Sequence, residues 1–94
     1  MTESLPGISV VIPAFNAQHT VSDLVGDYLA QTYGNLEIIC VDDGSDDDTL
    51  QCIRALAERH ENVRAVAIPH GGPTAARSAG ADAAAGEWII FADA

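Results

Sequence analysis

The chain has 94 residues, of which 48% are hydrophobic, so it can form one small domain with an apolar core and has no room for a second. Fourteen carboxylates face four cationic residues, all arginine, and the formal charge of -10 repels phosphate backbones, which excludes nucleic acid as a macromolecular partner. The absence of lysine excludes Schiff-base chemistry and a Walker phosphate-binding loop.

Cysteine usage and the N-terminal sequence bear on the cellular compartment. Cys40 and Cys52 are too few for a secreted disulfide framework, and both lie in apolar or helical patterns. The N-terminus has no basic segment followed by a long apolar stretch, and no run approaches the roughly 18 apolar residues of a membrane span. We therefore expect a cytoplasmic protein with reduced cysteines, and expect any membrane association to come from residues beyond position 94.

The chain begins with a strand pattern followed by a helix pattern. Residues 8–12 form a β-branched run that is apolar on both faces, as in a strand buried in a parallel sheet. Apolar residues then recur at helical spacing over residues 17–32. Asn16 or Thr20 is available as the N-cap of this helix, and Gly34 as its C-terminal stop.

The same alternation continues through the middle of the chain. Residues 36–41 form a second apolar run, and residues 63–68 a third. Between them, residues 45–60 have helical spacing, and Ser45 followed three residues later by Asp48 resembles a capping box. This pattern predicts a helix between two strands.

The last segment adds one more helix and one more strand. Pro73 suits the first position of an alanine-rich helix that ends at Gly86, and residues 88–92 form a fourth apolar run. The order βαβαβαβ predicts an α/β, Rossmann-like fold with a mainly parallel four-stranded sheet and helices on both faces. Ligands of such folds bind beyond the carboxyl ends of the strands, where the strand order reverses. Functional residues should therefore lie just after Ile12, Val41, Ile68 and Ala92.

The turn after the first strand contains Pro13, Ala14, Phe15 and Asn16. Its proline fixes the backbone, and the aromatic ring of Phe15 suits the cover of a planar ligand ring. A plain strand-to-helix turn capped by Asn16 explains the same residues, and this segment alone favours that interpretation.

The second strand is followed by two adjacent carboxylates, Asp42 and Asp43. Like charges disfavour each other's ionised forms, so such a pair favours ligand hydrogen bonding or metal binding over a structural role. The aspartates at 46–48 differ, because a helix N-terminus favours negative charge by about 0.3 to 1 kcal/mol each without any ligand. We leave these three out of the site.

The third strand leads into His70, Gly71 and Gly72 before Pro73. Paired glycines at a helix N-terminus let a ligand approach the backbone, and a helix start favours anions. A flexible loop before a helix explains the same residues, and the spacing of nucleotide-binding glycine motifs is absent. We interpret His70 and His19 as solvent-exposed loop residues.

Taken together, four segments resemble the successive motifs of family 2 glycosyltransferases, which have the GT-A fold. In order they are VVIPAFN at 10–16, VDDGS at 41–45, GGPTAAR at 71–77 and GEWIIF at 86–91. The resemblance implies an enzyme of cell-wall or polysaccharide biosynthesis. Such an enzyme transfers a sugar from a nucleotide-diphosphate sugar, here a UDP-sugar, to a hydroxyl of a saccharide, lipid or protein acceptor, with inversion.

The resemblance also implies roles for individual residues. Asp43 would accept the imide N–H of a uracil-like base, and Asp42 would share that role or brace the turn. Arg77 would lie near the nucleotide, or alternatively would only form a salt bridge to Asp42 or Asp43. The implied nucleotide-binding residues are Pro13, Ala14, Phe15, Asn16, Asp42, Asp43, Gly72 and Arg77.

The end of the chain matches the start of the family's Asp-x-Asp motif, whose carboxylates hold the ribose and a Mg²⁺ or Mn²⁺ ion on the diphosphate. Asp93 matches the first carboxylate, and the sequence ends at Ala94. We expect the second carboxylate and the catalytic base to lie beyond it, so that residues 1–94 are a truncated nucleotide-sugar-binding part, inactive alone. We also expect exposed apolar surface and homodimer formation through it or through an exposed strand.

Two alternatives belong to other functional classes. One is a non-catalytic nucleotide-binding or purely structural domain, which turnover of a UDP-sugar would distinguish from an enzyme. A receiver-type signalling domain also pairs acidic residues at a strand end and binds Mg²⁺, but it needs a lysine, and its acidic pair follows the first strand. This chain has no lysine, and its pair follows the second strand.

Overall fold

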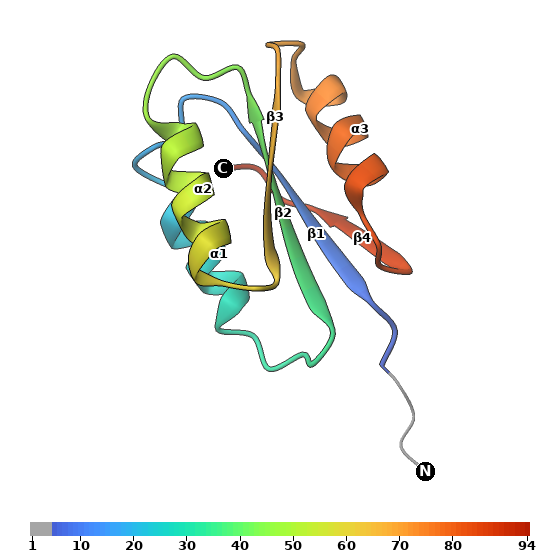
Figure 1. The fold of residues 1–94 in the computed structure, drawn as a ribbon. Helices are drawn as coiled ribbons and strands as arrows, with labels where there is room; N and C mark the ends of the chain where they lie inside the picture. Colours follow the sequence, from blue (N-terminus) through green and yellow to red (C-terminus); the bar gives the residue numbers. More distant parts are fainter. Residues whose placement is uncertain (1–4) are drawn as a thin grey trace.

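The computed structural model describes residues 5–94 and shows four strands alternating with three helices (Figure 1). The elements in chain order are β1 (Ile8–Ala14), α1 (Val21–Leu29), β2 (Leu36–Asp43), α2 (Thr49–Arg59), β3 (Val63–Ile68), α3 (Pro73–Ala83) and β4 (Trp88–Phe91). The predicted βαβαβαβ order is confirmed.

The strands form one parallel sheet in the order β3-β2-β1-β4. The chain first steps outward from β1 to β2 and β3, and α3 then carries it back across the sheet to the other side of β1. The strand order therefore reverses between β1 and β4. A parallel α/β sheet binds its ligands at the carboxyl end of such a reversal.

Helices cover both faces of the sheet, as the sequence predicts, with α1 and α2 on one side and α3 on the other (Figure 1). Alternate residues of the central strands feed two separate cores. Val10 and Ile38 pack with Ile53 of α2, whereas Val11 and Ile39 pack with α3. The central strands are thus apolar on both faces because both faces are buried.

Helix α3 approaches the sheet through a glycine. A Cβ atom built on Gly80 would lie 2.2 Å from Val11 Cγ1. The small residues of α3 therefore allow close contact between helix and strand, and Gly80 and Ala76 are its buried positions.

Several predicted helix ends are wrong. Helix α1 spans nine residues and is followed by Ala30 as its C-cap, so Gly34 does not stop it. Thr20 occupies the N-cap position without a side-chain capping bond. The predicted capping box is also wrong, because α2 begins only at Thr49 and Ser45 Oγ instead accepts the backbone N–H of Asn16.

The amino ends of the strands are tied together by a polar network around Glu37. Ser9 Oγ–H and Ala85 N–H each donate to Glu37 Oε2 at 2.6 Å, and Gly86 N–H donates to Ser9 Oγ at 2.9 Å. Arg64 Nη1 lies 3.7 Å from Glu37 Oε1. The network links β1, β2 and β3 to the segment that enters β4.

Strand β4 is at the edge of the sheet, and its four side chains are exposed on both faces. Trp88 is 65% exposed, and Ile89, Ile90 and Phe91 are 40–47% exposed. The expectation of exposed apolar surface is therefore confirmed. Within residues 5–94, no helix has the length and apolar character needed to cross a bilayer.

Both cysteines are free thiols, as predicted. Cys40 is fully buried in β2, and Cys52 is half-buried in α2. Burial raises the pKa of the Cys40 thiol to about 12, so its thiolate is not populated at neutral pH. Cys40 is therefore a structural core residue.

Candidate functional site

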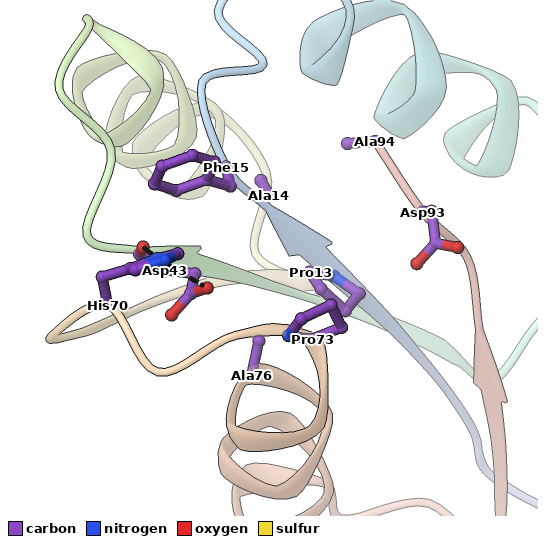
Figure 2. A pocket seen from close by; sticks show the side chains of 9 residues that line it. All are labelled: Pro13, Ala14, Phe15, Asp43, His70, Pro73, Ala76, Asp93 and Ala94. Atoms are coloured by element: carbon purple, nitrogen blue, oxygen red, sulfur yellow. Dashed lines mark hydrogen bonds and ion pairs between the residues drawn. The ribbon is translucent and has the colours of Figure 1, made fainter.

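A pocket of about 250 Å³ opens at the carboxyl ends of β1, β2 and β4 (Figure 2). This is the reversal point of the strand order, where the sequence places the site. Five of the nine predicted binding and metal residues line it. Its lining consists of Pro13, Ala14, Phe15, Asp43, His70, Pro73, Ala76, Asp93 and Ala94.

Asp93 reaches the pocket because the chain continues alongside β1 after β4 ends. Ala92 N–H donates to Val11 O at 3.0 Å, and Ala94 N–H donates to Pro13 O at 3.3 Å. These two bonds hold Asp93 beside the end of β1. Asp43 and Asp93, 50 positions apart in sequence, therefore line one pocket.

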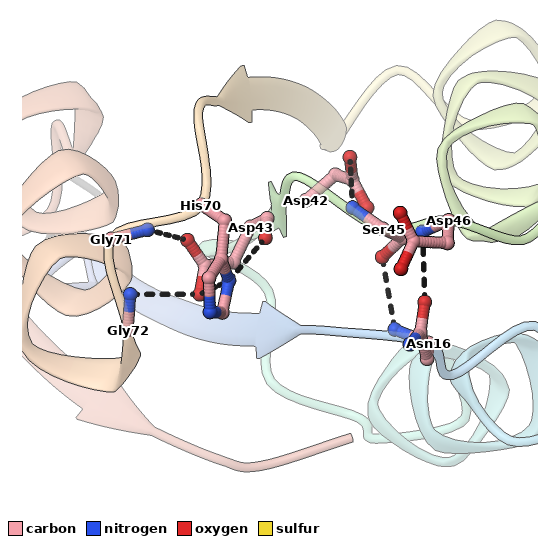
Figure 3. Close-up of polar contacts among 8 residues, drawn as sticks. All are labelled: Asn16, Asp42, Asp43, Ser45, Asp46, His70, Gly71 and Gly72. Carbon is pink, nitrogen blue, oxygen red and sulfur yellow. Dashed lines mark hydrogen bonds and ion pairs between the residues drawn. The ribbon is translucent and has the colours of Figure 1, made fainter.

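Asp43 is held by the loop that precedes α3 (Figure 3). Gly71 N–H donates to its Oδ1 at 2.8 Å, and Gly72 N–H donates to its Oδ2 at 3.0 Å. Asp43 is only 4% exposed, so these charge-assisted bonds compensate for its burial. Gly72 has a φ of 92°, a backbone conformation that favours glycine. Gly72 thus positions Asp43 from outside the pocket lining.

The two neighbouring carboxylates point to opposite faces of the sheet, as successive strand residues must. Asp43 faces the α3 side, whereas Asp42 is absent from the pocket lining and is 4% exposed. Asp42 Oδ2 accepts Ser45 N–H at 3.4 Å, and its Oδ1 has no hydrogen-bond partner among the described residues. The bond to Ser45 links Asp42 to the turn that follows β2.

Asn16 joins two loops and does not line the pocket. Its N–H donates to Ser45 Oγ, and its Oδ1 accepts Asp46 N–H, both at 2.9 Å (Figure 3). Its φ of 50° lies in the left-handed region, which asparagine tolerates. The helix-cap alternative for Asn16 is wrong, because its side chain bonds the β2–α2 loop.

Arg77 pairs with a different carboxylate from those predicted. Its Nη2 lies 3.4 Å from Asp93 Oδ1, and no salt bridge to Asp42 or Asp43 is found in residues 5–94. Both partners are partly exposed, with side-chain exposures of 41% for Arg77 and 75% for Asp93. Arg77 does not line the pocket, but it places a positive charge beside Asp93, one of the two carboxylates that do.

Sequence reasoning missed His70. Its side chain is 59% exposed, as a loop residue should be, but Nδ1 lies 3.0 Å from Asp43 O and 3.1 Å from Asp43 Oδ2. Its ring also lies against Phe15, with ring centroids 4.5 Å apart. The available signal was its place after β3, because side chains that follow neighbouring parallel strands meet at one edge.

The described side chains do not form a metal site by themselves. No group of three His, Cys, Asp or Glu side chains in residues 5–94 could hold a metal ion. Asp93 offers one carboxylate, which suits the oxygen ligands that Mg²⁺ and Mn²⁺ prefer. Mg²⁺ is commonly bound through one or two carboxylates together with substrate phosphates, so the remaining ligands would have to be diphosphate oxygens, water or other groups.

Comparison with known proteins assigns the family. Residues 9–94 match the model of the family described as glycosyl transferase family 2. The chain belongs to this family. An uncharacterized glycosyltransferase of Haemophilus influenzae is 34% identical over 91 residues, which cover 96% of this chain and 36% of that protein. The chain spans between 26% and 36% of the length of the first three curated relatives that it matches.

Solved structures of GT-A glycosyltransferases share the fold. S. aureus TarS, residues 1–349, in complex with UDP, superposes with a TM-score of 0.83 at 26% identity, covering 93% of this chain and 27% of that one. The mannosyltransferase PcManGT of Pyrobaculum calidifontis, in complex with GDP-Man and Mn²⁺, has a TM-score of 0.81 at 25% identity, covering 94% and 27%. The chain therefore has the Rossmann-like half of the GT-A fold that the sequence predicts.

Proposed function

We propose that the pocket at the carboxyl ends of β1, β2 and β4 binds the nucleotide of a UDP-sugar and supplies the donor side of glycosyl transfer. The observation that carries this proposal is that Phe15, Asp43 and Asp93 line one pocket at the reversal of the strand order. An aromatic ring and a buried carboxylate together suit a planar base that has an N–H donor.

Different residues of the pocket and its surroundings would bind the base, the ribose and the diphosphate. Phe15, 44% exposed at the pocket mouth, provides a face for the base, and Asp43 accepts its imide N–H. Asp93 lies on the β4 side, where the ribose hydroxyls would hydrogen-bond to its carboxylate. Arg77, beside Asp93, compensates for the negative charge of the diphosphate. A divalent cation, Mg²⁺ or Mn²⁺, would neutralise further charge on the diphosphate when bound.

The transfer step places further demands on the protein. In an inverting reaction, the acceptor hydroxyl oxygen bonds to the anomeric carbon while the bond to the diphosphate oxygen breaks, and a base takes the hydroxyl proton. We assign no residue of this chain as that base. The proposal for residues 1–94 is therefore nucleotide binding without turnover on their own. A purely nucleotide-binding domain is the second candidate, and both share the same pocket.

Calorimetric titration tests the proposal. UDP and GDP, each with and without Mn²⁺, are titrated into the wild-type chain and into Asp43→Ala and Asp43→Asn variants, with Asp46→Ala as the control for an exposed carboxylate. We expect binding of UDP that both Asp43 variants lose and the control retains. If the folded chain does not bind UDP, the assignment of a nucleotide site is wrong. If the Asp43 variants bind UDP as tightly as the wild type, the nucleotide site lies elsewhere on the protein. Turnover of a UDP-sugar separates an enzyme from a binding domain.

A further inference from the structure

His70 presents two features of a nucleobase to the pocket, a planar ring and a ring N–H group. Its Nδ1 lies 3.0 Å from Asp43 O and 3.1 Å from Asp43 Oδ2. A backbone carbonyl oxygen only accepts hydrogen bonds, so in the bond to Asp43 O the hydrogen is on Nδ1, which donates it. The imidazole of His70 thus donates a hydrogen bond to Asp43 as the imide N–H of a base would.

The ring face of His70 is engaged as well. It lies against Phe15 with ring centroids 4.5 Å apart and a tilt of 35° between the ring planes. A third ring between them would need a separation of about 7 Å, because each stacked contact takes about 3.5 Å. The side of Phe15 that meets His70 is therefore not free for a base.

Asp43 has little acceptor capacity left in this arrangement. Gly71 N–H, Gly72 N–H and His70 Nδ1–H already reach its carboxylate, which has about four acceptor positions. The two glycine donors belong to the backbone of the loop that begins α3, whereas the His70 side chain is 59% exposed. His70 is therefore the donor that can leave.

The backbone of His70 is fixed while its side chain can rotate. Gly44 has a φ of 68°, and a Cβ atom built on it would lie 2.6 Å from His70 N, so the two loops are in close backbone contact. A change at this position is a rotation of the imidazole about its own side-chain bonds. Rotamer changes of exposed side chains are fast, on the order of nanoseconds or less.

We propose that His70 fills the base position of the free protein, and that the nucleobase must displace it from Asp43 and Phe15 to bind. This inference rests on the proposed nucleotide pocket and adds a residue that sets its affinity. A site that is open in only a fraction of the molecules binds more weakly by that fraction. His70 therefore lowers the affinity for bases in general and favours those whose own N–H replaces its bond to Asp43.

Titration of variants tests this directly. Uridine and UDP are titrated into the wild-type chain, His70→Ala and the control His19→Ala, another exposed histidine, whose ring forms a hydrogen bond with the neighbouring Gln18 side chain. We expect His70→Ala to bind both ligands about three- to tenfold more tightly, because the site is no longer occupied, and His19→Ala to match the wild type. Equal or weaker binding by folded His70→Ala would overturn the proposal.

Nuclear magnetic resonance of the wild-type chain gives a second measurement that does not depend on a variant folding. Saturating uridine should shift the Nδ1 resonance of His70 and remove its ring contact with Phe15, whereas N3-methyluridine and pyrophosphate should leave both unchanged. A His70–Phe15 contact that persists at saturation contradicts the proposal. If neither uridine nor UDP binds any form of the chain, the proposed function itself fails. If UDP binding requires Asp43 but the His70 resonance and its contact with Phe15 do not change, only the displacement of His70 is ruled out.

Discussion

Arg77 Nη2 lies 3.4 Å from Asp93 Oδ1 and thereby links α3 to the residues that follow β4. Both side chains are more than one-third exposed, and exposed pairs of this kind contribute only about 0–1 kcal/mol to folding. The pair is therefore better placed for function than for stability. It brings the positive charge of Arg77 next to Asp93, one of the two carboxylates that line the pocket.

The first prediction separates these two roles of Arg77. Arg77→Gln should weaken UDP binding about tenfold or more, since a hydrogen bond to a charged group is worth about 1.5–3 kcal/mol. The free energy of unfolding should change by less than about 1 kcal/mol. Calorimetry and urea unfolding measure the two effects. Arg54→Gln, on an exposed position of α2, serves as the control, and a large loss of stability with unchanged binding would contradict the assignment.

The second prediction concerns pH and the Glu37 network. Burial raises the pKa of Glu37, but hydrogen bonds from Ser9 and Ala85 and the charge of Arg64 outweigh it, so the pKa lies below the ordinary value of 4.5. A carboxyl with a depressed folded pKa stabilises the fold above the unfolded value and loses that contribution as the pH falls through the folded value. Stability should therefore decline below pH 4.5.

Glu37→Gln tests this assignment. The variant should lose about 1 kcal/mol or more at pH 7, because the buried Ser9 hydroxyl and the Ala85 N–H lose a charged acceptor, and its decline below pH 4.5 should be shallower than that of the wild type. Glu58→Gln, an exposed glutamate of α2, should follow the wild-type curve. Equal acid sensitivity of Glu37→Gln and wild type would show that other groups control the decline.

The third prediction compares two glycines inside helices. Gly80→Ala should destabilise the fold by about 1–3 kcal/mol, because the added Cβ would lie 2.2 Å from Val11 Cγ1 and the helix must move. Gly26→Ala, where no atom lies within 4 Å of the added Cβ, should stabilise α1 by about 0.5–1 kcal/mol. Thermal and urea unfolding report both values. Effects of the same sign would contradict the close contact of α3 with β1.

The fourth prediction concerns the edge strand. Trp88 and Ile90 are exposed on one face of β4, and an unpaired apolar edge is a template for pairing with another copy. Light scattering should show concentration-dependent dimerisation, and Ile90→Lys should suppress it. Leu5→Lys, which changes a 51% exposed apolar residue outside β4, is the matched control. A strictly monomeric wild type at high concentration would rule out the dimer.

The sequence predicts the strands better than the loops, for a physical reason. An apolar run such as residues 36–41 indicates a buried strand, and this information lies in the composition of the segment itself. The start of a helix depends on hydrogen-bond partners that can lie far along the chain. Ser45 has the sequence pattern of a helix cap, but its hydroxyl oxygen accepts the backbone N–H of Asn16, 29 positions away. Tertiary bonds of this kind leave no local pattern.

The same distinction applies to the pocket. Phe15, Asp43 and Asp93 lie at the carboxyl ends of strands in one parallel sheet, so their meeting could be predicted from the alternation of strands and helices. The partners of His70 and Arg77 could not, because each depends on the path of a loop. His70 turns toward Asp43 since the glycines after it wrap around that carboxylate, and such a path follows from the assembled fold.

The Glu37 network fastens one rim of the sheet, and the pocket occupies the opposite rim. Because the two regions are separate, the sequence around the pocket can change without disturbing the Glu37 network. Loops that follow the four strands can be lengthened or changed in sequence to alter the pocket, while the far rim preserves the register of the strands. An engineer who seeks a new nucleotide specificity would therefore randomise positions 15, 70 and 93 and keep Ser9, Glu37 and Gly86 constant.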